Sequence, residues 1–486
     1  MATELRRAGP IEETLNDSVV TPRRGGGDDD EHDVPVLVLL WSRDEPERSG
    51  EAVHLPVVGS DLYTIGRAVC VDDDGAIALS FGQLRPAGRI DTGPLRAARI
   101  SRRQLAITHE AGDGLRIEQC GRGILRLDGH PMASGVIHPG GLIEVEHRLV
   151  LLYTHRPASW VKPRRPGSAD AFAFAFADPW GIVGESPMTW ELRRQIAFLA
   201  ARDEHVLVLG PSGSGKELVV QAIHGQSRRG RAPLVSRNAA TIPETLIDAE
   251  LFGNLRNYPN PGMPERPGLI GEADGGTLFL DEVGELPLRL QSHLLRAMDR
   301  GEYQRLGETR VRRADLRLLA ATNRGPAELK HDLLARFPHR LTIPGLNDRP
   351  EDTILIARHI LRGIAALDPE LVAPILQQGE PALDPELVAS LVGCRFDTHV
   401  RELQELLWRA LRGNLGDALT PPPELVRVVL PQPRADVAEP FTGALTRDGV
   451  LAALERCGGV KENAWRELGL RNRYQLNRLL KKLGIE

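Results

Sequence analysis

The stretch Gly210-Pro211-Ser212-Gly213-Ser214-Gly215-Lys216 lies between an apolar run, residues 206–209, and a helical stretch, residues 217–223. A buried strand, a glycine-rich turn and a helix in this order are typical of the phosphate-binding loop of a nucleoside triphosphatase. The glycines let backbone N–H groups turn towards phosphate oxygens, and the helix N-terminus adds its positive dipole end. Glu217 stands where this pattern usually has Ser or Thr to bind Mg²⁺, so other groups must bind the metal. The alternative is a glycine-rich turn without a ligand. The predicted nucleotide-binding residues are Gly210, Ser212, Gly213, Ser214, Gly215, Lys216 and Glu217.

Two adjacent acidic residues, Asp281 and Glu282, end another strongly apolar run, residues 277–280. Burial of two carboxylates at the end of an apolar strand costs free energy unless a partner offsets their charge. Mg²⁺ on Asp281 and an attacking water on Glu282 would supply such partners. The sequence therefore predicts an ATPase with ATP and Mg²⁺ as cofactors. An exposed acidic pair at the end of a strand is the alternative.

The composition indicates a multidomain protein and limits its partners. The chain has 486 residues, enough for two to four domains, and 41% of them are hydrophobic. A net charge of −5 excludes a chain that is basic throughout, so any contact with nucleic acid must be local. The four cysteines lie far apart without metal-ligand spacing, as expected in a reducing compartment. No apolar run is long enough to span a membrane, and no signal-peptide pattern is present. We therefore expect a cytoplasmic protein.

The pattern of apolar residues changes along the chain and predicts separate domains. Short apolar runs between turn residues predict a β-sandwich, and later alternation of strands and helices predicts a parallel sheet covered on both faces. The phenylalanine repeat at 171–176 is either an extra edge strand or a segment that docks on a neighbouring domain. The expected segments are a disordered tail (1–33), an all-β sandwich (34–156), a linker (157–179), an α/β subdomain (180–345), a helical lid (346–419), a second linker (420–444) and an all-α C-terminal module (445–486).

The order of the motifs from residue 184 onwards resembles that of bacterial enhancer-binding proteins, which are AAA+ ATPases that activate sigma-54 RNA polymerase. The resemblance implies a homo-oligomeric ring, DNA upstream of promoters as a partner, and sigma-54 RNA polymerase as a candidate partner. It rests on Gly184-Glu185-Ser186, the phosphate-binding loop, Glu250-Leu251-Phe252-Gly253, Gly276-Thr277-Leu278-Phe279-Leu280-Asp281-Glu282 and Ala321-Thr322-Asn323-Arg324.

The same resemblance implies roles for four further residues. Asn238 matches the asparagine that couples to the strand-end glutamate, here Glu282. Asn323 matches the sensor I region, and Arg401 matches the sensor II arginine. Arg336 matches an arginine finger, which places a fixed cation where negative charge builds on the transferring phosphoryl group of the neighbouring subunit. A surface salt bridge is the alternative for Arg336.

Two positions depart from the pattern of that family. Lys330 replaces a second arginine that acts across the subunit boundary, which keeps the charge but loses the two-pronged geometry. The Gly-Ala-Phe-Thr-Gly-Ala signature, which contacts the sigma factor, is replaced by Asn257-Tyr258-Pro259-Asn260-Pro261-Gly262, followed by more prolines up to residue 267. Proline stiffens the loop and removes hydrogen-bond donors. Two explanations stay open: a diverged sigma-54 activator, and a motor with another client.

The N-terminal domain resembles a forkhead-associated (FHA) domain, a β-sandwich that binds phosphothreonine. Ile65-Gly66-Arg67 resembles its Gly-Arg motif, and Ser101-Arg102-Arg103-Gln104 resembles its Ser-x-x-His motif with Gln in place of His. Arg67 and Ser101 would hold a phosphate through charge-assisted hydrogen bonds, with Arg102 assisting. The resemblance implies a phosphothreonine-containing protein as a partner. A sandwich whose phosphate site has decayed is the alternative.

The C-terminal module resembles a Fis-type helix-turn-helix. It carries nine Lys or Arg against five Asp or Glu, so it is basic within an acidic chain. Apolar residues recur at helical spacing and would form its core. Polar residues at the start of the second helix would read base edges, and later basic residues would contact phosphates. A solvated helical face is the alternative. The predicted DNA-binding residues are Arg471, Asn472, Arg473, Gln475, Asn477, Arg478, Lys481 and Lys482.

Three hypotheses for the function follow from these patterns. The first is a DNA-binding, ATP-dependent transcription regulator of the sigma-54 activator type that senses phosphothreonine through its N-terminal domain. The second is a regulator with the same parts whose motor does not act on sigma-54. The third, a chaperone-like unfoldase, is disfavoured because it leaves the C-terminal module without a role.

Overall fold

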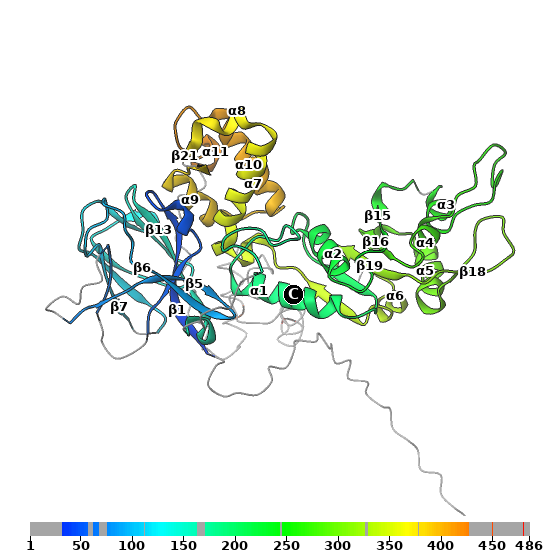
Figure 1. The fold of residues 1–486 in the computed structure, drawn as a ribbon, viewed down its shortest axis with the longest axis horizontal. Coiled ribbons are helices and arrows are strands. Elements are labelled where there is room, and N and C mark those ends of the chain that lie inside the picture. The colour runs from blue at the N-terminus through cyan, green and yellow to red at the C-terminus, as the bar shows by residue number, and fades with distance from the viewer. Residues whose placement is uncertain are drawn as a thin grey trace, which may run out of the picture.

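A computed structural model places a β-rich part, a helical lid and an α/β part in an elongated arrangement (Figure 1). The structure describes residues 32–426 apart from 57–61, 68–74, 111, 163–170, 244, 326–328 and 378, and beyond 426 only positions 450 and 480. Apart from these two positions, the predicted helix-turn-helix module therefore lies outside the described residues, as does nearly all of the predicted tail. Within the described ranges, no helix has the length and apolar character to cross a bilayer.

The N-terminal part consists of two β-sheets that face each other, which confirms the predicted β-rich fold. All neighbouring strands are antiparallel except β3 and β4. The first sheet has the order β10 (His130–Pro131), β9 (Leu125–Leu127), β12 (Leu142–Val145), β13 (Leu149–Pro157), β1 (Asp33–Ser42), β2 (Ala52–His54), β5 (Phe81–Arg85) and β6 (Gly88–Gly93). The second has the order β11 (Ser134–Ile137), β8 (Leu115–Gln119), β7 (Leu105–His109), β3 (Tyr63–Ile65) and β4 (Ile77–Ala78).

Strand β1 is buried on both faces. Leu37 and Leu39 belong to the core between the two sheets. Val36, Val38 and Leu40 alternate with them, point to the opposite face, and belong to a core shared with the helical lid. The β-rich part is therefore packed against the lid through an apolar interface.

The central part is a parallel sheet covered on both faces, as predicted. Its strands are β15 (Leu234–Asn238), β16 (Thr277–Asp281), β19 (Arg317–Thr322), β14 (Val206–Leu209) and β20 (His339–Thr342), in this order. One face packs against α1 (Pro187–Ala200) and α2 (Lys216–Gly225). The other packs against α3 (Ile247–Phe252), α4 (Leu269–Glu272) and α5 (Leu288–Arg300). The ribbon of β17 (Glu302–Tyr303) and β18 (Arg312–Arg313) and helix α6 (His331–Ala335) complete this part.

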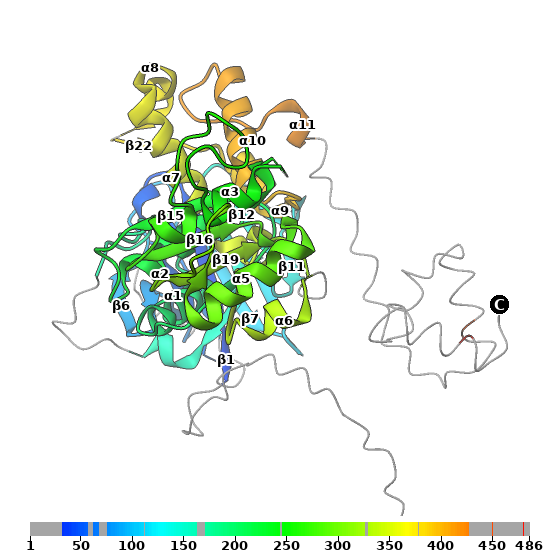
Figure 2. The same ribbon diagram turned by 90° about the vertical axis from the view of Figure 1, so that its right-hand side faces the viewer.

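The lid is mainly helical and lies above the α/β part in the view of Figure 2. Its central helix, α7 (Thr353–Leu367), is apolar on most of its surface because it packs against both the other lid helices and the segment that follows β1. The other elements are α8 (Pro369–Val372), α9 (Pro385–Gly393), α10 (Val400–Gly413), α11 (Pro423–Val426) and a ribbon of β21 (Leu376–Gln377) and β22 (Glu380–Pro381).

Candidate functional site

The loop at 210–216 joins β14 to α2 as the sequence predicts. Gly213 and Gly215 have φ values of 75° and 95°, a region that favours glycine. Lys216 begins α2, is only 8% exposed, and donates from Nζ to the carbonyls of Gly210 (3.1 Å) and Pro211 (3.3 Å). The lysine ammonium is therefore held against the carbonyls of the loop, and the N-terminus of α2 adds the positive dipole end that favours a phosphate.

The lid contacts this loop directly. A Cβ on Gly213 would lie 2.1 Å from the carbonyl oxygen of Thr398, so only glycine fits there. The amide of Val400 donates to the carbonyl of Gly213 (3.3 Å). Arg401, in the first turn of α10, donates to the Ser212 hydroxyl (3.2 Å). The predicted sensor II arginine is therefore positioned at the phosphate-binding loop.

The acidic pair lies at the carboxyl end of β16, next to the loop. The parallel register places Asn238 of β15 opposite Asp281. The Asn238 amide therefore donates to the Asp281 carboxylate (3.2 Å), and not to the neighbouring Glu282 to which the family pattern couples it. Burial, and then the charge of Glu282, raises the pKa of Asp281 above its ordinary value.

Glu282 links three elements of the site. Its backbone lies in the left-handed region, with φ of 51°. One carboxylate oxygen lies 3.7 Å from Lys216 Nζ, and the other accepts a hydrogen bond from the backbone N–H of Asn323 (3.1 Å). Because three neighbouring elements fix its position, the carboxylate is held where it can polarise a water near the terminal phosphate.

The residues around Asp281 fit Mg²⁺. Burial, and then repulsion from Glu282 and the exposed Glu217, raises the pKa of Asp281, and a bound cation would offset both effects. No group of three metal-ligating side chains occurs among the described residues. Mg²⁺ is commonly bound through one or two carboxylates together with nucleotide phosphates and water.

Arg336 follows α6 and is about half exposed. Its Nε lies 2.5 Å from an Asp299 carboxylate oxygen on α5. Within one chain the residue thus forms the surface ion pair that is the alternative to an arginine finger, since a finger acts only across a subunit boundary. Lys330 precedes α6 as the residue before its first turn. The roles of Arg336 and Lys330 in a neighbouring subunit remain predictions.

Known proteins are similar to this chain over most of its length. A model of the sigma-54 interaction domain matches residues 182–342. The nitric oxide reductase transcription regulator NorR2 of Cupriavidus necator is 33% identical over 430 residues, which cover 78% of this chain and 81% of that protein. The chain belongs to the sigma-54-interacting family of transcription regulators. It is therefore an ATPase.

Two further proteins are similar to this chain. The transcriptional regulatory protein ZraR of Escherichia coli K12 is 34% identical over 313 residues, which cover 62% of this chain and 69% of that protein. A crystal structure of NtrX from Brucella abortus in complex with ATP is 29% identical, with a TM-score of 0.44, and the match covers 63% of this chain and 69% of that one.

The β-rich part of this family member carries a cavity of about 490 Å³ at the end of its sheets. The predicted Arg67 and Ser101 both line it, and the Arg67 amide donates to the Ser101 carbonyl (3.2 Å). Arg102 is exposed and does not line it, so its assisting role remains a prediction. Sequence reasoning missed four further arginines that line the cavity: Arg43, Arg99, Arg122 and Arg148.

Gln104 holds the rim of this cavity in place. It is fully buried, accepts a hydrogen bond from the Ser101 amide (3.0 Å), and donates to the Arg122 carbonyl (3.0 Å). The Arg148 guanidinium also donates to the Arg122 carbonyl. Gln104 therefore supplies both an acceptor and a donor at the position where the FHA pattern has His.

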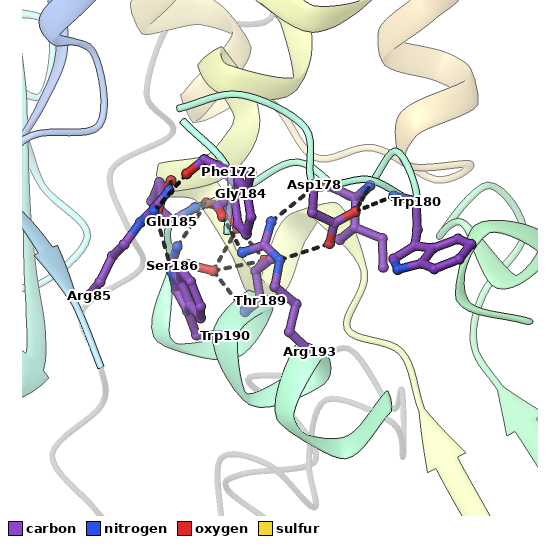
Figure 3. Close-up of polar contacts among 12 residues, drawn as sticks. Arg85, Phe172, Asp178, Trp180, Gly184, Glu185, Ser186, Thr189, Trp190 and Arg193 are labelled. Atoms are coloured by element: carbon purple, nitrogen blue, oxygen red, sulfur yellow. Dashed lines mark hydrogen bonds and ion pairs between the residues drawn. The ribbon is translucent and has the colours of Figure 1, made fainter. Parts of the chain in front are cut away.

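A buried ion pair next to aromatic side chains joins the β-rich part to the α/β part, and we call it the clasp. Sequence reasoning did not find it. Arg85 of β5 pairs with Glu185 (2.5 Å), and both side chains are almost fully buried (Figure 3). The Arg85 guanidinium also lies 4.7 Å from the ring centre of Phe172 and 5.1 Å from that of Trp190. Glu185 accepts a hydrogen bond from the Trp190 indole (3.0 Å).

The phenylalanine repeat thus docks on two neighbouring parts and adds no strand. Phe172 and Phe174 cover Arg85 of the β-rich part, whereas Phe176 lies 4.3 Å from the guanidinium of Arg362 on α7. Of the two alternatives left open by the sequence, the structure supports docking.

The loop at 254–266, which replaces the sigma-contact signature, packs against a second loop that contains Leu306 and Gly307. Asn254 bridges to both Arg266 and Leu306, and its amide donates to the Pro264 carbonyl (2.8 Å). Tyr258 is 45% exposed and packs over Gly307, where a Cβ would lie 2.7 Å from the tyrosine ring. The two loops project together next to α3 and β18, at the end of the molecule farthest from the β-rich part (Figure 1).

Proposed function

We propose that this protein is an ATP-driven, DNA-binding transcription regulator whose motor responds to a phosphothreonine signal. The observation that carries this proposal is the position of the lid. One side of the lid places Arg401 on the Ser212 hydroxyl of the nucleotide loop, and its other side shares a core with β1. A ligand on the β-rich part can therefore bias the position of a residue at the nucleotide.

ATP hydrolysis follows from the side chains at the loop. Lys216 offers a cation to the terminal phosphates, and Glu282, held by the backbone N–H of Asn323, orients the attacking water. Bound Mg²⁺, with Asp281 as its ligand, would neutralise charge on the phosphates. Arg336 would complete the site of the next subunit in a homo-oligomeric ring.

The arginine-lined cavity supports the sensing role. Arg67, Ser101 and the four further arginines combine cations with a hydroxyl, which is the chemistry that recognises a phosphate dianion. The proposed DNA contacts come from the basic residues of 445–486, which lie outside the described residues. A structure of this module with DNA would test them.

The experiment that tests the proposal measures ATP turnover by the full chain with and without a phosphothreonine peptide. We expect the phosphorylated peptide to change the turnover rate, the unphosphorylated peptide to have no effect, and Arg67→Ala to abolish the response. An identical rate with both peptides would contradict phosphothreonine sensing and leave the ATPase assignment unaffected.

A second candidate function is favoured by the loop at 254–266. Its aromatic tip residue, Tyr258, is packed on Gly307, and three of its prolines fall between residues 259 and 264. The loop differs in chemistry from the sigma-contact signature, which supports a regulator of this family whose motor acts on another client.

A further inference from the structure

A second cavity, of about 320 Å³, lies where the β-rich part meets the lid. Its walls come from both sides: Trp41 and Ser42 end β1, whereas Glu380, Asp384 and Asp417 belong to the lid. Arg43 and His147 line this interdomain cavity and also the arginine-lined cavity. The two cavities are therefore neighbours that share a wall.

Two buried polar groups at the interdomain cavity have no partner among the described residues. Ser42 is fully buried and its hydroxyl makes no hydrogen bond, although it lines the cavity. Arg358 is 3% exposed, and its Nε is likewise unsatisfied. Buried polar groups normally have a partner, so these two atoms are an unusual feature of the wall between the β-rich part and the lid.

The two cavities differ in charge. The arginine-lined cavity carries five guanidinium groups and one carboxylate, that of Glu146. The arginines are Arg43, Arg67, Arg99, Arg122 and Arg148. The lid wall of the interdomain cavity instead carries three carboxylates.

Only some of these lid carboxylates already have a partner. Glu380 pairs with Arg358 and Arg362, both at 2.8 Å. Asp384 uses one oxygen to cap α9 through the Glu386 amide (2.8 Å). Asp417 is exposed, so its carboxylate and the second oxygen of Asp384 are open to a cationic ligand.

We propose that the two cavities form one site for a phosphorylated peptide, in which the lid selects a basic side chain near the phosphothreonine. This inference rests on the proposed phosphothreonine binding. The phosphate lies among the arginines, the peptide passes Arg43 and His147, and an Arg or Lys of the peptide lies against Asp384 and Asp417.

A peptide bound in this way contacts the β-rich part and the lid at once. It therefore stabilises the arrangement in which both walls are present, and in that arrangement Arg401 contacts the nucleotide loop. The contacts between the peptide and the lid would therefore determine both the peptide sequence that the site prefers and the effect of the peptide on the ATPase.

The test uses the full chain and three sets of phosphothreonine peptides, with Arg or Lys, Ala, or Glu at the positions that flank the phosphothreonine. We expect the basic set to bind at least about tenfold more tightly than the Ala set, a difference of about 1.4 kcal/mol. The double variant Asp384→Asn, Asp417→Asn should lose this preference and still bind the Ala set as the unchanged chain does. Asn at 384 keeps an oxygen for the helix cap, and Glu405→Gln on the exposed face of α10 is the matched control.

A charge reversal separates recognition from a loss of structure. Asp417→Lys should shift the preference towards the Glu set. Equal binding of all three sets, with Arg67→Ala still abolishing it, would overturn the inference and leave phosphothreonine binding in place. Binding of none of the sets would overturn both.

Discussion

Arg85 of β5 and Glu185, which lies just before α1, form an ion pair 2.5 Å apart whose side chains are 2% and 1% exposed. Three aromatic rings surround the guanidinium, and the centre of each lies within 5.3 Å of its central carbon. They belong to Phe172, Phe174 and Trp190. A second buried pair, Arg156 with Glu351 at 2.6 Å, joins β13 to the lid. The β-rich part is thus held to the motor by charge pairs inside an apolar interface.

Arg85→Ala should lower the free energy of unfolding by about 3–5 kcal/mol, because it leaves the Glu185 carboxylate buried without its cation. Urea unfolding followed by tryptophan fluorescence measures this loss, since Trp190 lies in the same cluster. Arg194→Ala is the control, because the exposed Arg194–Glu191 pair has the same 2.5 Å separation and should contribute less than about 1 kcal/mol. Equal losses in both variants would refute a special role for the buried clasp.

The nucleotide site could be predicted from the sequence because its determinants are local. A strand, a glycine turn and a lysine at the start of a helix are read within a dozen residues, and the acidic pair ends its own strand. The clasp could not be predicted in this way, since Arg85 and Glu185 lie 100 positions apart and no short pattern pairs them.

One local signal of the interface was nevertheless present in the sequence. Residues 36–40 of β1 are all apolar, whereas a strand with one solvated face alternates apolar and polar residues. An uninterrupted run of this kind is typical of burial on both faces, and the structure places Val38 against the lid and Leu39 in the sandwich core. The identity of the covering element depends on contacts distant in the sequence.

Glu282→Gln should bind ATP but hydrolyse it at least about a hundredfold more slowly, because the amide cannot act as a base for the attacking water. Lys216→Ala should lose nucleotide binding as well, since the cation that meets the phosphates is gone. Equilibrium binding of a fluorescent ATP analogue and steady-state phosphate release measure the two effects. An unchanged turnover rate in Glu282→Gln would refute its assignment.

Arg336→Ala should lower turnover and leave nucleotide affinity nearly unchanged, because the side chain is expected to act on the nucleotide of the next subunit. Mixing Arg336→Ala with Lys216→Ala subunits tests this directly: each ring then contains some sites with an intact loop and an intact neighbouring arginine. Recovery of activity in the mixture is the expected result. If the mixture shows no recovery, the residue is only the partner of Asp299.

The β-rich part should lose stability in acid because of His54 on β2. Burial, together with the charges of Arg89 and His109, lowers the pKa of His54 from 6.5 to about 4. Between these values the unfolded chain binds a proton that the folded chain does not, so the free energy of unfolding falls as the pH falls from 6.5 to 4. The melting temperature of His54→Gln should depend less on pH in this window. If the melting temperatures of His54→Gln and of the unchanged chain depend on pH in the same way, His54 is not the source of the acid sensitivity.

The last prediction concerns the client of the motor. A loop that contacts a sigma factor must present a mobile tip that moves with the nucleotide state, but Tyr258 here packs over Gly307 and Asn254 joins the loop to its neighbour. The prolines of 257–267 fix φ and stiffen the tip further. We therefore expect weak or absent open-complex formation by sigma-54 polymerase with this protein and ATP, under conditions where ATP is hydrolysed.

A transition-state complex of the ATPase offers a second measurement of the same prediction. Binding of purified sigma-54 to the protein trapped with an ATP transition-state analogue should be weak. The same loop carries Met263 beside Gly262, and Tyr258→Ala with Met263→Ala should not weaken the binding further. Robust open complexes that are lost in this double variant would instead show that the tyrosine and the methionine form the sigma contact. In that case the altered loop would be a diverged form of the signature with the same client, because a small apolar tip would have kept the function of the original one.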